Sequence, residues 1–204
     1  MNRLYKCATL LIAMTLLGIG VAHAEGPEYT ALTDAEASAL AADWSQMPQA
    51  LQAASIDELL KDLPKIIQAV DPALSDTEKL SRYMTIAVIG LYLGWDGAAE
   101  VAAAMLKAVP ADYRLNVALA MYSVSGDKAE PIYEALVEAL GDQGLQDAFA
   151  TTSQNPAAAI DWGPVQAALD LLFREGSGVV GGKNPNARAP DVVAQPVVVP
   201  APKY

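Results

Sequence analysis

Residues 75–140 decide the fold, and they read SDTEKLSRYMTIAVIGLYLGWDGAAEVAAAMLKAVPADYRLNVALAMYSVSGDKAEPIYEALVEAL. The stretch begins with Ser75-Asp76-Thr77-Glu78, a capping box in which the serine hydroxyl accepts from the glutamate N–H and the glutamate carboxylate reaches back. Thirteen residues without a formal charge, 83–95, follow. A helix that is apolar on every side is buried or lies in a membrane, and thirteen residues are too few to span a bilayer. We therefore expect a helix buried at the centre of the domain.

A repeat within this stretch predicts two helical hairpins. Asp96-Gly97-Ala98 is echoed 31 residues later by Asp127-Lys128-Ala129. Apolar residues follow each copy at matching positions, namely Val101, Met105, Leu106 and Val109, then Ile132, Leu136, Val137 and Leu140. The order of helix, Gly-Asp turn and helix resembles a tetratricopeptide-type hairpin stack, whose repeat is about 34 residues long. The Trp-Leu-Gly-Tyr consensus of that family does not occur in order, so the resemblance implies hairpin architecture and not membership.

The sequence on either side of this stretch is also helical in pattern. Capping boxes at residues 33–36 and 55–58 predict two further helix starts. Trp44 falls on the apolar face of the first of these helices, which we expect Pro48 to close. Pro64 interrupts the second helix and predicts a kink or two short helices. Because no window before residue 176 alternates convincingly as a strand, we expect an all-α fold, a single-domain bundle or short stack of helical hairpins over residues 32–175.

The N-terminus has the pattern of a signal peptide. Arg3 and Lys6 precede an apolar run at residues 8–21, and Ala22-His23-Ala24 is a small-x-small cleavage site. We therefore predict a signal peptide at residues 1–24, a lead-in at 25–31, and export to the periplasm or the medium. The apolar run is shorter than the roughly 20 residues of a spanning helix, so no membrane span is expected after cleavage, although a retained anchor is the alternative.

Residues 176–204 differ in composition from the rest of the chain. Four glycines come first, at 176, 178, 181 and 182, and five prolines follow, at 185, 190, 196, 200 and 202. This composition predicts a disordered C-terminal tail. The runs Val192-Val193 and Val197-Val198-Val199 suggest the alternative that the tail adds a strand to a partner's sheet.

Cleavage after Ala24 would remove the chain's single cysteine, Cys7, and its single histidine, His23. The remaining chain would lack disulfides, a Cys–His pair, a Ser–His–Asp triad and an imidazole zinc site. Its 11 basic and 24 acidic residues give a formal charge of −13, which disfavours nucleic acid binding. The Asp-x-Asp-x-Asp spacing of calcium loops is missing, so acidic groups such as Asp57, Glu58 and Asp62 are interpreted as a polar helix surface. We expect no cofactor and no metal.

Two patterns suggest catalysis and are better explained otherwise. Ser125-Gly126-Asp127-Lys128 and Ser153-Gln154-Asn155 resemble the Ser-x-x-Lys and Ser-x-Asn elements of penicillin-binding proteins and serine β-lactamases. No Lys-Thr-Gly or Lys-Ser-Gly motif follows, and Ser125 falls in a turn, so we interpret it as a solvated turn residue. Glu130, Glu134 and Glu138 share one helix face, whereas glycoside hydrolysis needs carboxylates facing each other across a sugar. We therefore name no catalytic residue and keep an enzyme using carboxylates and lysine as a third hypothesis.

Aromatic residues concentrate around the repeated hairpins and predict a ligand or partner groove. Four of them are the candidate site residues: Tyr92, Trp95, Tyr122 and Tyr133. The first functional hypothesis is an exported, non-catalytic helical protein-interaction module that binds a protein partner. The alternative is a carrier or binder of a small apolar ligand within the helical bundle, suggested by the apolar helices at 83–95 and 115–124.

Overall fold

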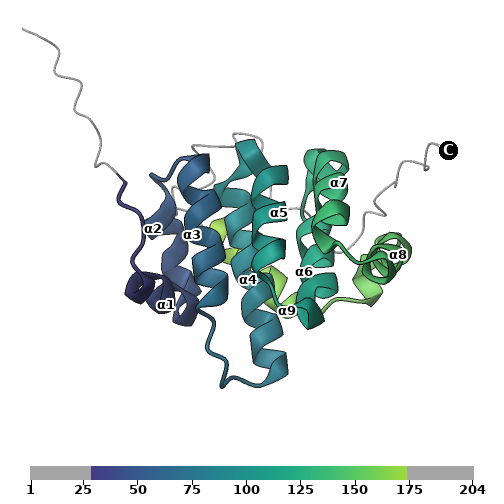
Figure 1. The fold of residues 1–204 in the computed structure, drawn as a ribbon, viewed down its shortest axis with the longest axis horizontal. Coiled ribbons are helices and arrows are strands. Elements are labelled where there is room, and N and C mark those ends of the chain that lie inside the picture. The colour runs from purple at the N-terminus through teal and green to yellow at the C-terminus, as the bar shows by residue number, and fades with distance from the viewer. Residues whose placement is uncertain (1–28, 174–204) are drawn as a thin grey trace, which may run out of the picture.

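The computed structural model describes residues 29–173 (Figure 1). Within this range the chain forms nine α-helices and four 3₁₀ turns, with no strand, so the all-α prediction is confirmed. The α-helices are α1 (Asp34–Ala42), α2 (Met47–Leu51), α3 (Ile56–Gln68), α4 (Asp76–Leu93), α5 (Ala98–Ala108), α6 (Ala111–Ser123), α7 (Ala129–Leu140), α8 (Gln143–Thr152) and α9 (Trp162–Leu172). The predicted signal peptide and C-terminal tail lie outside the described residues and stay predictions.

The central helix is α4, as the sequence predicts. All three predicted capping boxes form, and at α4 the Glu78 N–H donates to Ser75 Oγ at 3.3 Å while the Ser75 N–H donates to Glu78 Oε2 at 2.9 Å. Every residue from 83 to 95 is buried. Among the described residues no single helix is long and apolar enough to cross a membrane, and only the pair Asp76–Leu93 and Trp95–Ala108, bent by 99°, meets that requirement by length and composition.

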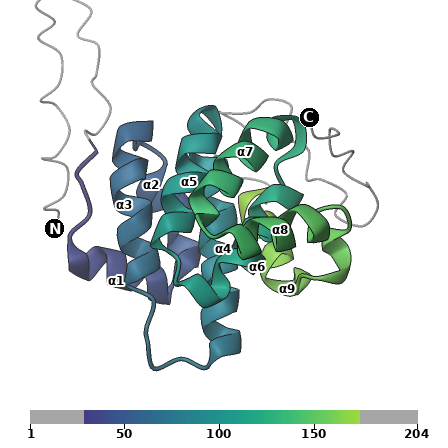
Figure 2. The same cartoon turned by 45° about the vertical axis from the view of Figure 1, so that its right-hand side comes forward.

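The other helices surround α4. Helices α3, α5 and α7 lie side by side in that order, α4 packs beside α6, and α9 covers α4 from behind (Figure 1). Helices α1 and α2 lie at one end of this stack, and α7 and α8 lie at the other (Figure 2). The core is the apolar surface that these helices share around α4.

The sequence repeat corresponds to two equivalent turns. The 3₁₀ turns η2 (Trp95–Gly97) and η3 (Gly126–Lys128) lie 31 residues apart. The first joins α4 to α5, and the second joins α6 to α7. The Lys128 ammonium donates to the Trp95 carbonyl and lies 5.4 Å from the centroid of the Trp95 ring. The second turn is therefore bonded directly to the first.

The structure contradicts the prediction made for Pro48 and one of the two alternatives predicted for Pro64. Pro48 does not end the first helix, because α1 stops at Ala42 and the chain continues through η1 (Trp44–Gln46) into α2, where Pro48 lies in the first turn. Trp44 is consequently a half-buried residue of η1 and not part of a helical stripe. Helix α3 continues through Pro64 as one helix, so it is not two short helices. The buried neighbours Leu63 and Ile66 hold this turn against the core, and such packing overrides local propensity.

Candidate functional site

The four predicted site residues form two separate aromatic pairs. Tyr92 stacks on Trp95 with ring centroids 5.2 Å apart, and its hydroxyl donates to the Val124 carbonyl at 3.2 Å. Tyr122 meets Tyr133 edge to face at 5.6 Å, and both rings contact Phe149. Tyr92, Trp95 and Tyr122 are buried and Tyr133 is half-buried. None of the four lines either of the two cavities described below.

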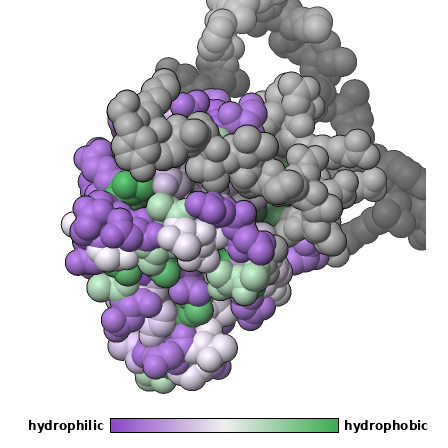
Figure 3. Space-filling view, turned by 90° about the vertical axis from the view of Figure 1, so that its right-hand side faces the viewer, coloured by the Kyte–Doolittle hydropathy of each residue, from purple (hydrophilic) through white to green (hydrophobic). Residues whose placement is uncertain are grey.

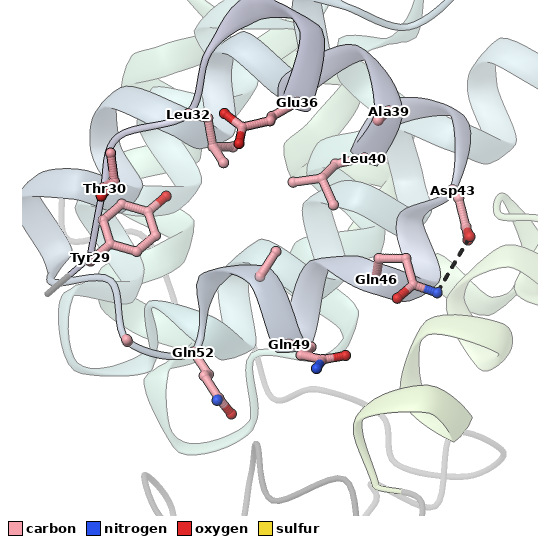
Figure 4. Close-up of a pocket in the computed structure, with 12 residues that line it drawn as sticks. Tyr29, Thr30, Leu32, Glu36, Ala39, Leu40, Asp43, Gln46, Gln49 and Gln52 are labelled. Carbon is pink, nitrogen blue, oxygen red and sulfur yellow. Dashed lines mark hydrogen bonds between the residues drawn. The ribbon is translucent and has the colours of Figure 1, made fainter. Parts of the chain in front are cut away.

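The larger cavity is an open groove between α1 and α2, with a volume of about 620 Å³ (Figure 4). The segment before α1 closes one end of it. The lining residues are Tyr29, Thr30, Leu32, Glu36, Ala39, Leu40, Asp43, Gln46, Gln49, Ala50, Gln52 and Ala53. We call this feature the α1–α2 groove.

Hydrogen bonds to Asp43 form the turn that places α1 opposite α2. The Asp43 carboxylate accepts from the Ser45 N–H at 3.2 Å and from the Ser45 hydroxyl at 2.5 Å, and the Gln46 amide donates to it at 3.5 Å. These bonds start the η1 turn directly after α1, and α2 follows with Pro48 near its start. The chain therefore reverses within a few residues, and α1 and α2 face each other across an open space (Figure 4).

The groove combines an apolar lining with a polar rim. Figure 4 shows Leu40 of α1 pointing into the space above α2. Ala39, Ala50 and Ala53 are exposed, so small side chains leave room for an incoming group. Around them lie three glutamines, Gln46, Gln49 and Gln52, all exposed, whose amides can both donate to and accept from a peptide backbone.

The N-terminal wall of the groove is fixed by Asp62 of α3, a residue with no exposed surface. Its carboxylate accepts from the Tyr29 hydroxyl at 2.8 Å, the Leu32 N–H at 3.1 Å and the Lys65 ammonium at 2.8 Å. Lys65 also donates to the Leu32 carbonyl at 3.1 Å. We call residues 29–32 the strap, because the three bonds that involve Tyr29 and Leu32 tie that segment to α3.

The electrostatics of this cluster favour a charged Asp62. Burial by itself would raise the pKa of Asp62, but the hydrogen bonds from Lys65, Leu32 and Tyr29 together outweigh it and hold that pKa below its usual value. Burial and the bond to Asp62 raise the pKa of the Tyr29 phenol. The interpretation of Asp62 as part of a polar helix surface is therefore wrong. One signal could have found it, since Asp62 lies three residues after Leu59 and four before Ile66, on the buried face of α3.

The rim of the groove carries two carboxylates that are stabilised in their charged form. Glu36 accepts from the Thr33 N–H at 2.8 Å and from the Thr33 hydroxyl at 2.7 Å, which lowers the pKa of Glu36. The hydrogen bond from the Ser45 hydroxyl is the main cause of a lowered pKa of Asp43. Both side chains are exposed. The groove therefore presents negative charge beside apolar surface at neutral pH.

The second cavity, about 310 Å³, lies where α4, α6 and α9 begin. Asp76, Asp112 and Asp161 contribute to its lining. The Tyr113 hydroxyl donates to Asp76 at 2.9 Å, and this bond is the main cause of a raised Tyr113 pKa. Within residues 29–173, no group of three or more His, Cys, Asp or Glu side chains is arranged to hold a metal ion. These carboxylates are therefore assigned to helix starts.

The two catalytic patterns are explained by structural contacts. Ser125 is buried, and its hydroxyl donates to the Tyr122 carbonyl at 2.6 Å, so the interpretation as a solvated residue is wrong. The Lys128 ammonium is bonded to Trp95 and not to Ser125. Glu130, Glu134 and Glu138 are all exposed, which confirms their interpretation as a solvated helix face.

Comparison of the chain with protein-family models, with curated proteins and with solved structures finds no match. The α1–α2 groove and the contacts around it are therefore the basis of the functional proposal.

Proposed function

We propose that this chain is an exported, non-catalytic helical protein-interaction module whose α1–α2 groove binds an apolar segment of a partner protein. The observation that supports this proposal is the groove itself, an open space of about 620 Å³ with apolar lining and polar rim. Recognition of a partner segment in an apolar groove is a recurring mode of peptide binding.

The groove is organised before any partner arrives. The strap is held by three hydrogen bonds to Asp62 and Lys65, and α1 and α2 each pack on the stack through buried residues such as Leu40 and Leu51. A wall that is already ordered costs less entropy on binding than one that must fold around its ligand. The exposed Ala50 and Ala53 leave space for partner side chains, and the rim glutamines supply hydrogen bonds for a partner backbone.

Site-specific photocrosslinking tests this function. A photoreactive amino acid placed at Ala50, in the groove, should give a discrete crosslinked product in an extracytoplasmic extract. The matched control is Glu134, which is exposed on α7 at the other end of the stack and should give none. In the part of that end that Figure 3 shows in colour, hydrophilic residues alternate with separate apolar patches. Ala53→Arg, which fills the groove from an exposed position, should abolish the Ala50 product. Equal labelling from both positions, or no product at Ala50, would refute the proposal.

Export is tested separately. When the full chain is produced in an export-competent bacterium, the protein recovered outside the cytoplasm should begin at Glu25. Intact-mass spectrometry measures this. A product that keeps residues 1–24, or remains in the cytoplasm, contradicts this part of the proposal.

The second candidate function is binding of a small apolar ligand, and the size of the α1–α2 groove favours it. Small-molecule sites typically have volumes of about 300–1,000 Å³, and the groove lies within that range. This version places the ligand between α1 and α2 and not beside α4, whose residues 83–95 are all buried. Native mass spectrometry of freshly purified protein should then show a lipid-sized adduct that Ala53→Arg removes. A clean apo mass contradicts this version.

A further inference from the structure

Charge is distributed unequally along this chain. Residues 29–173 contain 7 basic and 20 acidic side chains, whereas residues 174–204 contain 4 basic and 2 acidic side chains. The C-terminal 31 residues and the folded domain therefore carry opposite net charge. Opposite charge draws a tethered segment towards the domain surface, more strongly at low salt.

The C-terminal segment also carries apolar side chains that match the apolar lining of the α1–α2 groove. Val192, Val193 and residues 197–199, all valine, lie between Arg188 and Lys203. The groove offers the complementary pattern, with leucine and alanine side chains in its lining and the charged carboxylates Glu36 and Asp43 on its rim. Valines entering the groove would leave water, and Arg188 and Lys203, which outnumber the single acidic residue Asp191 in this segment, would meet negative charge.

We propose that residues 188–203 of this chain occupy the α1–α2 groove in the free protein, so that a partner must displace them. The inference rests on the proposed function, because it takes that groove to be the partner site. It adds a built-in competitor that sets how tightly a partner must bind.

The chain is long enough for this contact. Nineteen Cα–Cα steps lead along the chain from Phe173, the last described residue, to Val192. At roughly 3.3–3.6 Å per residue they reach about 65 Å when extended. A compact domain of this size has a diameter of about 38 Å, and half its circumference is about 60 Å. The valines can therefore reach the groove from the end of α9, whichever path they take over the surface.

Tethering makes even a weak contact effective. A segment joined to its site by a short linker has an effective concentration in the millimolar range. A dissociation constant near ~1 mM for the free peptide would then fill about half of the grooves in the intact chain. Tight binding of the isolated segment is not required.

Disulfide trapping in the full chain tests the proposal. Cys7 is the only cysteine, so a Cys7→Ser background carries no other thiol. Adding Ala50→Cys and Val198→Cys places one thiol in the groove and one in the valine run. The control pair is Glu134→Cys with Val198→Cys, on the distant α7. We expect the groove pair to form an intramolecular disulfide at least tenfold faster than the control pair under mild oxidation, measured on a non-reducing gel.

Two outcomes would overturn the proposal. Equal rates for the two pairs would show that the segment does not prefer the groove. Linked dimers that form in proportion to protein concentration would assign the occupant to a second copy.

A charge reversal tests the electrostatic part of the proposal. Exchanging both basic residues, by Arg188→Glu with Lys203→Glu, should slow the groove disulfide severalfold. An unchanged rate would contradict the charge complementarity.

Failure of this inference and failure of the proposed function are distinguishable. If the groove binds no partner, the photocrosslink at Ala50 to another protein is missing while the intramolecular disulfide still forms. If the segment does not occupy the groove, the disulfide is slow while the partner crosslink persists.

Discussion

At the scale of single residues, the Asp62 side chain holds the wall of the groove in place. A fully buried carboxylate is costly unless hydrogen bonds and an opposite charge compensate it. Here three donors from three residues do so, and two of them belong to the strap that forms the groove wall. Asp62 therefore acts as a positioning residue for the groove and does not itself line it.

Asp62→Ala should destabilise the protein by about 1–3 kcal/mol, because it leaves the Tyr29 hydroxyl, the Leu32 N–H and Lys65 without their shared acceptor. Urea denaturation at pH 7 measures the difference. The control is Asp57→Ala, an exposed carboxylate of the same helix, which should change stability by less than about 0.5 kcal/mol. Equal effects of the two substitutions would mean that the Asp62 cluster contributes nothing beyond an ordinary surface charge.

The same cluster predicts a pH dependence. Because the folded-state pKa of Asp62 is lowered, its contribution is present above the unfolded-state pKa, roughly 3.9, and is lost as pH falls through the lower folded value. Asp62→Asn mimics the protonated state. The stability gap between the wild type and Asp62→Asn should therefore be largest above about pH 5 and should narrow below about pH 4. A gap that stays constant between pH 3 and pH 7 would contradict a charged Asp62.

At the scale of elements, close approach at the end of α4 fixes the first hairpin. A Cβ atom at Gly94 would lie 2.6 Å from Val101 Cγ2 of α5, and the branched valine has little freedom to move. Gly94→Ala should cost about 1–3 kcal/mol through overpacking. The double variant Gly94→Ala with Val101→Ala should lose less stability than the sum of the losses in the two single variants. A double-mutant cycle of thermal unfolding measures this difference. Strict additivity of the two changes would refute the steric explanation.

The elements also show what a sequence can predict. Capping boxes at Thr33, Ser55 and Ser75 are local patterns, and each one starts a helix where expected. The apolar run at 83–95 and the 31-residue echo depend on periodicity, and both appear as the buried α4 and the paired turns η2 and η3. These features were predictable because each follows from a short local motif or from a regular pattern along the chain.

The α1–α2 groove was not predictable in the same way. Pro48 is compatible with the end of one helix and with the start of another, and the Asp43–Ser45 bonds decide between them. The division of the four aromatic residues into two pairs was not predictable, because ring partners are set by packing between distant segments. Tyr92, for example, meets Phe173 edge to face with centroids 5.4 Å apart. Spacing along the chain contains no information about such a pair.

At the scale of the whole molecule, the stack has an interior and an edge with different stabilities. Helix α4 is enclosed by α3, α5, α6 and α9, whereas α1 packs mainly on α3 and keeps most of its residues exposed. Local opening is cheapest where few apolar contacts must be broken. The groove therefore lies at the less stable end of the fold, beside a wall that depends on the Asp62 cluster.

Hydrogen exchange of the full chain should reveal this gradient. Amides of α4 should exchange most slowly, and amides of α1 should exchange at least about a hundredfold faster, because α1 can open without disturbing the core. Asp62→Asn should accelerate α1 further while leaving α4 nearly unchanged, since only the tie between the strap and α3 is weakened. Uniform protection across α1 and α4, or equal acceleration of both in the variant, would mean that the groove end and the core open together. In that case binding of a partner at the α1–α2 groove would stabilise the whole domain and would raise protection at α4 as much as at α1.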